Sequence, residues 1–118
     1  MEITRIYPAN KQLNAAEKYR AVKSASAIGI SKTDVDEIEI SFVVFYTDTD
    51  KKTGEQKTVV SIVTPDGKTF TTNSPYFIET FAGMLTIFEE SGEPVNKIKV
   101  IRQRSKGGRN FIDCDFIE

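Results

Sequence analysis

The densest run of side chains able to hold a charged ligand lies near the C-terminal end of the chain. Between residues 95 and 112 there is no acidic group, and the basic ones are Lys97, Lys99, Arg102, Arg104, Lys106 and Arg109. The other hundred residues carry ten basic and seventeen acidic groups, so the net charge of −1 conceals a basic segment on an acidic body. Cations that follow a phosphate backbone bind nucleic acid by releasing its counterions. The pattern therefore predicts a nucleic-acid contact in this segment.

A single strand also needs flat side chains on which its bases stack, each stacked base contributing roughly 1–3 kcal/mol. The candidate platforms are Tyr46, Phe70 and Phe111. Phe111 follows the basic loop and alternates with Ile112, so it faces outward if Ile112 faces the core. For Tyr46 and Phe70, packing in the core or at a sheet edge is the competing interpretation.

Three further lysines lie in or beside a polar turn near the middle of the chain: Lys51, Lys52 and Lys57. The same turn contains Asp48, Asp50 and Glu55, but it lacks the spacing of a calcium loop. We interpret it as a solvated turn whose lysines add to the nucleic-acid contact.

The residue types that most enzymes and metal sites use are scarce. The chain has no His, which removes the commonest general base and the commonest metal ligand. Its one cysteine, Cys114, allows neither an internal disulfide nor a cysteine-based zinc site. Asp113 and Asp115 share one strand face, as a pair of metal ligands could, but the sequence offers them no third partner. We therefore expect a non-enzymatic protein with no catalytic residue, no cofactor and no metal.

No segment has the character of a membrane span or a signal peptide. The longest apolar run is residues 42–46, and the N-terminus lacks a basic stretch followed by a long apolar one. We expect a cytoplasmic protein without a membrane contact.

Hydrophobic periodicity and turn residues predict five strands and two helices. The strands are expected at residues 36–47, 57–64, 68–72, 96–104 and 110–117. One helix runs from Asn14 to about Ser24, where Asn14 and Glu17 make a capping box. The other begins at Ser74 and Pro75 and ends at residues 89–92. Residues 1–13 form an N-terminal arm or edge strand.

The order β-β-β-α-β-β, preceded by the extra helix, is that of a five-stranded OB-fold barrel. We therefore predict a mostly β protein with a single OB-fold domain over residues 1–118. A split SH3-like barrel and an open α+β sheet are the alternatives. In an OB-fold, the loops after the first and the fourth strand flank the oligonucleotide groove.

Three short motifs also occur in the order typical of one protein family. They are N-x-A-E-x-Y at Asn14–Tyr19, TPDG-x-x-x-x-TNSP-x-FI at Thr64–Ile78, and SKGGR at Ser105–Arg109. Together they resemble the small single-stranded DNA-binding proteins of phages that infect Gram-positive bacteria. The resemblance covers most of residues 12–117.

The resemblance implies an OB-fold that coats single-stranded DNA during phage replication or recombination in the bacterial host cytoplasm. It implies a homodimer or larger assembly and, as candidate partners, recombinase or replication proteins of phage or host. The chain has no Trp, so the Trp stacking platform common in such proteins is missing, and Tyr or Phe must serve.

The leading hypothesis is a sequence-independent single-stranded DNA-binding protein that combines phosphate neutralisation with base stacking. The alternative is a non-enzymatic OB-like protein-interaction or accessory module, in which the basic hairpin meets an acidic partner. A nuclease that uses Asp113 and Asp115 is a weaker third hypothesis.

Overall fold

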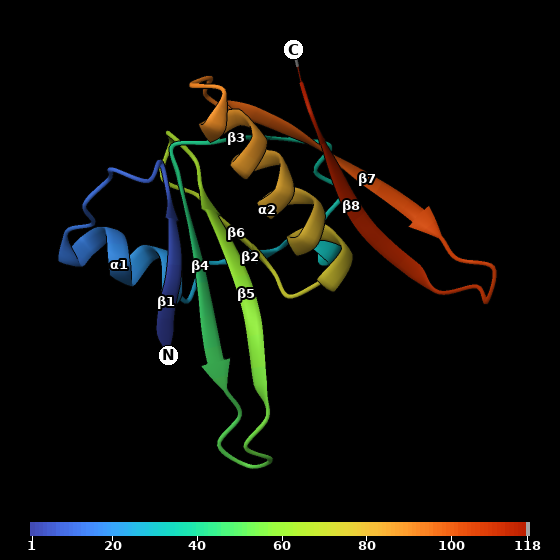
Figure 1. Cartoon of the computed structure of the whole chain (residues 1–118). Coiled ribbons are helices and arrows are strands. Elements are labelled where there is room, and N and C mark those ends of the chain that lie inside the picture. Colours follow the sequence, from blue (N-terminus) through green and yellow to red (C-terminus); the bar gives the residue numbers. More distant parts are fainter. Residues whose placement is uncertain (118) are drawn as a thin grey trace.

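Two β-sheets form the framework of the computed structural model, which describes residues 1–117 (Figure 1). The larger sheet has the order β1 (Glu2–Tyr7), β4 (Phe42–Thr49), β5 (Gln56–Val63), β6 (Thr69–Thr72), β2 (Ile28–Gly29). The smaller sheet has the order β3 (Glu37–Glu39), β7 (Lys97–Arg104), β8 (Asn110–Phe116). The remaining elements are the helices α1 (Ala15–Val22) and α2 (Pro75–Glu90) and the 3-10 turn η1 (Ile30–Lys32).

The strand predicted at residues 36–47 is two strands that belong to different sheets. The break falls at Ile40 and Ser41, whose backbone N–H groups donate to the carbonyls of Asn96 (2.9 Å) and Val63 (2.8 Å) respectively. On one side of the break, β3 pairs antiparallel with β7, and on the other, β4 pairs with β1 and β5. The expectation of one continuous strand is therefore wrong, because hydrogen bonding to two sheets divides it.

β4 is buried on both faces, and each face belongs to a separate hydrophobic cluster. Val43 and Phe45 point into the main core with residues of α2 and the smaller sheet. Phe42, Val44 and Tyr46 point the other way, into a smaller cluster beneath α1. This arrangement explains why the sequence loses its polar alternation after Ser41.

Both predicted helices form. The Asn14 and Glu17 capping box is present, with the Glu17 N–H donating to Asn14 Oδ1 over 2.9 Å. In α2, Phe77, Phe81 and Leu85 are fully buried, as the helical spacing predicts. Ser74 and Pro75 begin α2 as expected, although the Ser74 side chain makes no capping hydrogen bond. No helix within residues 1–117 is long and apolar enough to cross a membrane.

Side-chain hydrogen bonds attach α1 to the larger sheet. Ser61 Oγ donates to the carbonyl of Ala21 over 2.6 Å, and Thr69 Oγ1 donates to that of Arg20 over 3.0 Å. Both acceptors lie near the C-terminal end of α1. The helix therefore sits firmly on the outer face of the sheet.

The mostly β class is confirmed, but the two sheets are not closed into a barrel. In the described residues, β8 pairs with β7, and β6 pairs with β5 and β2. The N-terminal arm is the edge strand that we considered, since β1 pairs antiparallel with β4 and has an irregular register between Ile3 and Arg5. The short parallel β2–β6 pair was not predicted.

A hydrogen bond to Tyr7 connects β1 to the segment that precedes β7, and its contribution to stability can be tested. The Val95 N–H donates to Tyr7 Oη over 2.7 Å, and both residues are buried. Tyr7→Phe leaves a buried N–H without an acceptor, so we expect the free energy of unfolding to fall by about 1–3 kcal/mol in urea denaturation. Tyr19→Phe is the matched control, because the Tyr19 side chain is exposed. Equal effects of the two substitutions would contradict the assignment.

Candidate nucleic-acid interface

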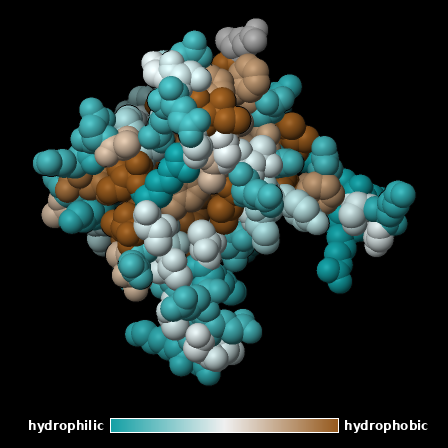
Figure 2. Space-filling view, viewed as in Figure 1, coloured by the Kyte–Doolittle hydropathy of each residue, from teal (hydrophilic) through white to brown (hydrophobic). Residues whose placement is uncertain are grey.

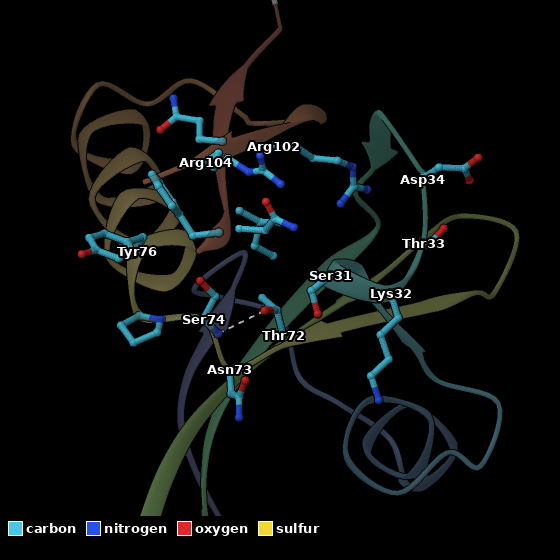
Figure 3. A pocket seen from close by; sticks show the side chains of 15 residues that line it. Ser31, Lys32, Thr33, Asp34, Thr72, Asn73, Ser74, Tyr76, Arg102 and Arg104 are labelled. Carbon is cyan, nitrogen blue, oxygen red and sulfur yellow. Dashed lines mark hydrogen bonds between the residues drawn. The ribbon is translucent and has the colours of Figure 1, made fainter. Parts of the chain in front are cut away.

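A groove of about 1110 Å³ lies where η1, the start of α2 and the β7–β8 hairpin converge (Figure 3). One wall is formed by residues 31–34, the floor by residues 72–76, and the other side by residues 102–104 and 110–112. Figure 3 shows Arg102 and Arg104 between Tyr76 on one side and Asp34 on the other. The groove therefore combines groups from both sheets and from α2.

Strand alternation divides the basic residues of β7 between its two faces. Arg102 and Arg104 have the parity of the buried Ile98 and Val100, and they line the groove. The opposite face carries the two lysines of the strand, Lys97 and Lys99. The six basic residues of this segment therefore do not form one surface.

The two lysines of β7 lie among acidic groups instead. Lys97 Nζ is 2.8 Å from Glu37 Oε1, and this hydrogen bond and the charge of Glu37 raise the pKa of the Lys97 ammonium group. Lys99 is exposed, and its cross-strand neighbours are Glu37 and Asp115. A phosphate near either lysine would therefore also meet carboxylates.

Arg102 is committed to the protein rather than fully available to a ligand. Its guanidinium donates to the carbonyl of Ile30 over 3.3 Å and to that of Val35 over 2.9 Å. These bonds connect β7 to the two ends of the segment that forms the groove wall. Arg102 therefore shapes the groove, whereas Arg104 is exposed in the groove and makes no side-chain hydrogen bond within the described residues.

Two aromatic rings stand at the mouth of the groove. The centroids of Tyr76 and Phe111 are 5.1 Å apart with an interplanar angle of 41°. Tyr76 is 61% exposed, and Phe111 is half-buried beside the buried Ile112, so the predicted parity of β8 is confirmed. An exposed ring supported by a second ring is the type of surface on which a base stacks.

The other two predicted platforms lie in the core. Tyr46 and Phe70 are each 8% exposed and belong to the cluster under α1 and to the main core, respectively. Burial raises the pKa of the Tyr46 hydroxyl. The structure favours the core interpretation for both, because neither ring offers a free face to a base.

The remaining predicted cations are exposed on two hairpins that project from the body (Figure 1). Lys106 and Arg109 lie in the β7–β8 loop, and Lys51 and Lys52 lie in the β4–β5 loop. Figure 2 shows hydrophilic side chains covering both projections. Lys57, at the start of β5, lines a smaller hollow of about 540 Å³ next to the groove.

Among the basic and aromatic residues that line the groove, Lys32 and Tyr76 were missed from the sequence. Tyr76 carried a usable signal, since it lies next to Pro75 and outside the buried stripe of α2. Lys32 carried none, because its position depends on long-range bonds from Arg102 to the segment that contains it.

The other polar candidates of the smaller sheet have local roles. Asp113 and Asp115 each accept a backbone N–H from the following residue, over 2.9 Å in both cases. Within residues 1–117, no group of three or more His, Cys, Asp or Glu could hold a metal ion. Burial, helped by the two aspartates, raises the pKa of the Cys114 thiol to about 12, so this thiol is neutral and unreactive at neutral pH.

A mostly β domain with cations and exposed aromatic rings along one groove is typical of proteins that bind single-stranded nucleic acid. The comparison with known families agrees: residues 8–116 match the model of the phage single-stranded DNA-binding proteins of the phi29 type, and the chain belongs to this family. The resemblance seen in the sequence motifs is thereby confirmed. No curated protein and no solved structure matches the chain.

The bonds of Arg102 predict a local effect that is separate from ligand binding. Arg102→Gln removes the contacts that hold both ends of the groove wall, so we expect faster amide hydrogen exchange in residues 31–35. Arg104→Gln is the matched control, since Arg104 lines the same groove without contacting that wall by a hydrogen bond in the described residues. Unchanged exchange in the Arg102 variant would show that other contacts hold the wall.

Proposed function

We propose that the protein binds single-stranded DNA, without reading its sequence, in the groove between η1, β7 and the start of α2. The observation that carries the proposal is that Arg104 and the Tyr76–Phe111 ring pair line the same groove, in a chain of the phage single-stranded DNA-binding family. Phage DNA replication and recombination are the processes in which such binding would act.

The mechanism that the groove supports has two parts. Arg104 lies where phosphates would pass, and Lys106 and Arg109 extend the positive charge along the hairpin, with Lys32 at the border of the groove. A base stacks on Tyr76, whose ring is supported by Phe111. Stacking of this kind accepts any base, but it requires a base that is free of a duplex. These two contacts therefore favour single strands without sequence preference.

The connectivity of the strands supports an OB-like interpretation of the fold. The bent β3–β4 segment, β5, β6, α2, β7 and β8 follow the predicted order, and an OB-fold is itself only a partly open barrel. On this interpretation the β4–β5 hairpin flanks the groove, and its lysines contact a longer strand: Lys51, Lys52 and Lys57. A homodimer or larger assembly and a replication or recombinase partner stay predictions, as does action in the host cytoplasm.

The electrostatic part is tested by titrating the protein against labelled oligo-dT and a duplex of equal length, with fluorescence anisotropy as the readout. We expect tighter binding of the single strand and a linear fall of log affinity with log salt concentration. Arg104→Ala should make the salt slope shallower by about 0.7, the value for one phosphate contact on a single strand.

Lys97→Ala is the control for that titration, because Lys97 lies on the opposite face of the strand, paired with Glu37. We expect its salt slope to equal that of the unmodified protein. Equal affinity for duplex and single strand would reject the proposed function. If Lys97→Ala reduced the salt slope more than Arg104→Ala did, the proposal that DNA binds on the Arg104 face of β7 would be rejected.

The stacking part is tested at Tyr76. Because Tyr76 is exposed, Tyr76→Ala should leave the melting temperature unchanged while weakening oligo-dT binding by about 1–3 kcal/mol, with an unchanged salt slope. Tyr76→Phe should retain the affinity, since the ring is kept. Tyr19→Ala is the matched control, as Tyr19 is equally exposed on α1. A loss of affinity in the Tyr19 variant alone would place the DNA on the other side of the molecule.

A further inference from the structure

The C-terminal end of α2 carries exposed apolar side chains that the DNA groove does not use. Ile87 is 63% exposed and Phe116 is 41% exposed, and the Phe88 and Phe116 ring centroids are 5.7 Å apart. A hollow of about 270 Å³ lies beside them, lined in part by Pro94 and Ile117. Figure 2 shows hydrophobic surface gathered where Figure 1 places the ends of α2 and β8. We call this surface, made of Ile87, Phe88, Pro94, Phe116 and Ile117, the α2-end patch.

Negative charge accompanies the α2-end patch. No Lys or Arg occurs between residues 69 and 96, and the last turn of α2 has no basic residue. Glu89 is paired with Arg5 over 3.0 Å, but Glu90 and Glu93 are exposed. The carbonyl end of the helix adds partial negative charge.

The positive group nearest to the hollow does not cancel this charge. Lys97 lines the hollow, but its ammonium group lies 2.8 Å from a carboxylate oxygen of Glu37. The patch is therefore an apolar surface with an acidic border, a combination that suits a ligand with apolar and basic groups side by side.

We propose that the α2-end patch docks a segment of another protein in which apolar side chains are flanked by Lys or Arg. The apolar side chains would enter the hollow beside Phe116, and the cations would meet Glu90, Glu93 and the end of α2. Nucleic acid is a poor occupant, because the acidic border repels phosphate.

A second copy of the chain fits less well than such a segment. Two copies joined through the same patch would bring Glu90 and Glu93 against their own counterparts. The basic β7–β8 loop of a second copy would supply cations, but residues 102–110 contain no apolar side chain to enter the hollow. Charge and composition therefore both favour a different protein.

The α2-end patch and the DNA groove lie at opposite ends of one helix. Tyr76 stands at the start of α2 and Ile87 three turns later, which corresponds to about 16 Å along the axis. A bound strand and a docked segment therefore need not compete. The docking proposal does not depend on DNA binding, but if both hold, the protein can bring its partner to the coated strand.

The test uses a fluorescein-labelled peptide, Lys-Lys-Phe-Phe-Lys-Lys, and the complete chain, with anisotropy as the readout. Two control peptides replace either the Lys residues by Glu or the Phe residues by Ser. We expect saturable binding of the first peptide only. Ile87→Ser should weaken it about tenfold, the effect of losing one apolar side-chain contact.

Matched variants separate the patch from general attraction to an acidic protein. The double substitution Glu90→Gln and Glu93→Gln should weaken peptide binding. Tyr19→Ser should not weaken it, because the Tyr19 side chain lies on α1, outside the patch, although it is as exposed as that of Ile87. If Ile87→Ser disturbs folding, the second measurement is the NMR amide chemical shifts of the unmodified protein during titration with the peptide. We expect these shifts to change at residues 87–97 and 116–117.

Three results would overturn the docking proposal. The first is equal binding of the peptide without Phe, which would show attraction by charge alone. The second is a set of shift changes centred elsewhere. The third is self-association in light scattering that Ile87→Ser abolishes while the peptide fails to bind, which would make a second copy the occupant.

Discussion

Two consecutive backbone hydrogen bonds, at Ile40 and Ser41, commit one stretch of chain to two sheets. Neighbouring N–H groups of an extended chain point in opposite directions, and each needs an acceptor when buried. Here the first acceptor is Asn96, before β7, and the second is Val63, at the end of β5. The sheets are therefore joined at this bend while their strands diverge, and the buried stripe of α2 fills the space between them.

The groove proposed for DNA follows from the same divergence. Because β6 and β8 do not pair, the space between the larger sheet and the β7–β8 hairpin is left to side chains. The start of α2 forms its floor, and Arg102 holds η1 across it as a wall. A closed barrel would have placed strand pairing there instead. The opening of the sheets is thus the structural reason that the proposed DNA groove exists.

Much of this architecture is local and could be predicted: the capping box of α1, the buried stripe of α2 and both long hairpins. The division of the strand at Ile40 could not be predicted, because the alternation of apolar residues continues from β3 into β4. Only hydrogen bonds to partners distant in sequence divide the strand there. The same limit applied to Tyr46, whose burial depends on α1 covering the outer face of the sheet. For β7, alternation alone separates Arg102 and Arg104 from Lys97 and Lys99, whereas counting charges groups them.

The unequal distribution of charge makes the electrostatic potential differ between the two ends of α2. Phosphates are attracted to the groove and the β7–β8 loop, where the cations gather, and are repelled by Glu90 and Glu93 at the far end of α2. In the proposed function, this field orients a strand before any base stacks on Tyr76. Because α2 is a single rigid element, its two ends keep a fixed separation, so the acidic, apolar end stays exposed when the end beside the groove is covered. One helix thus separates the surface proposed for nucleic acid from the surface proposed for protein.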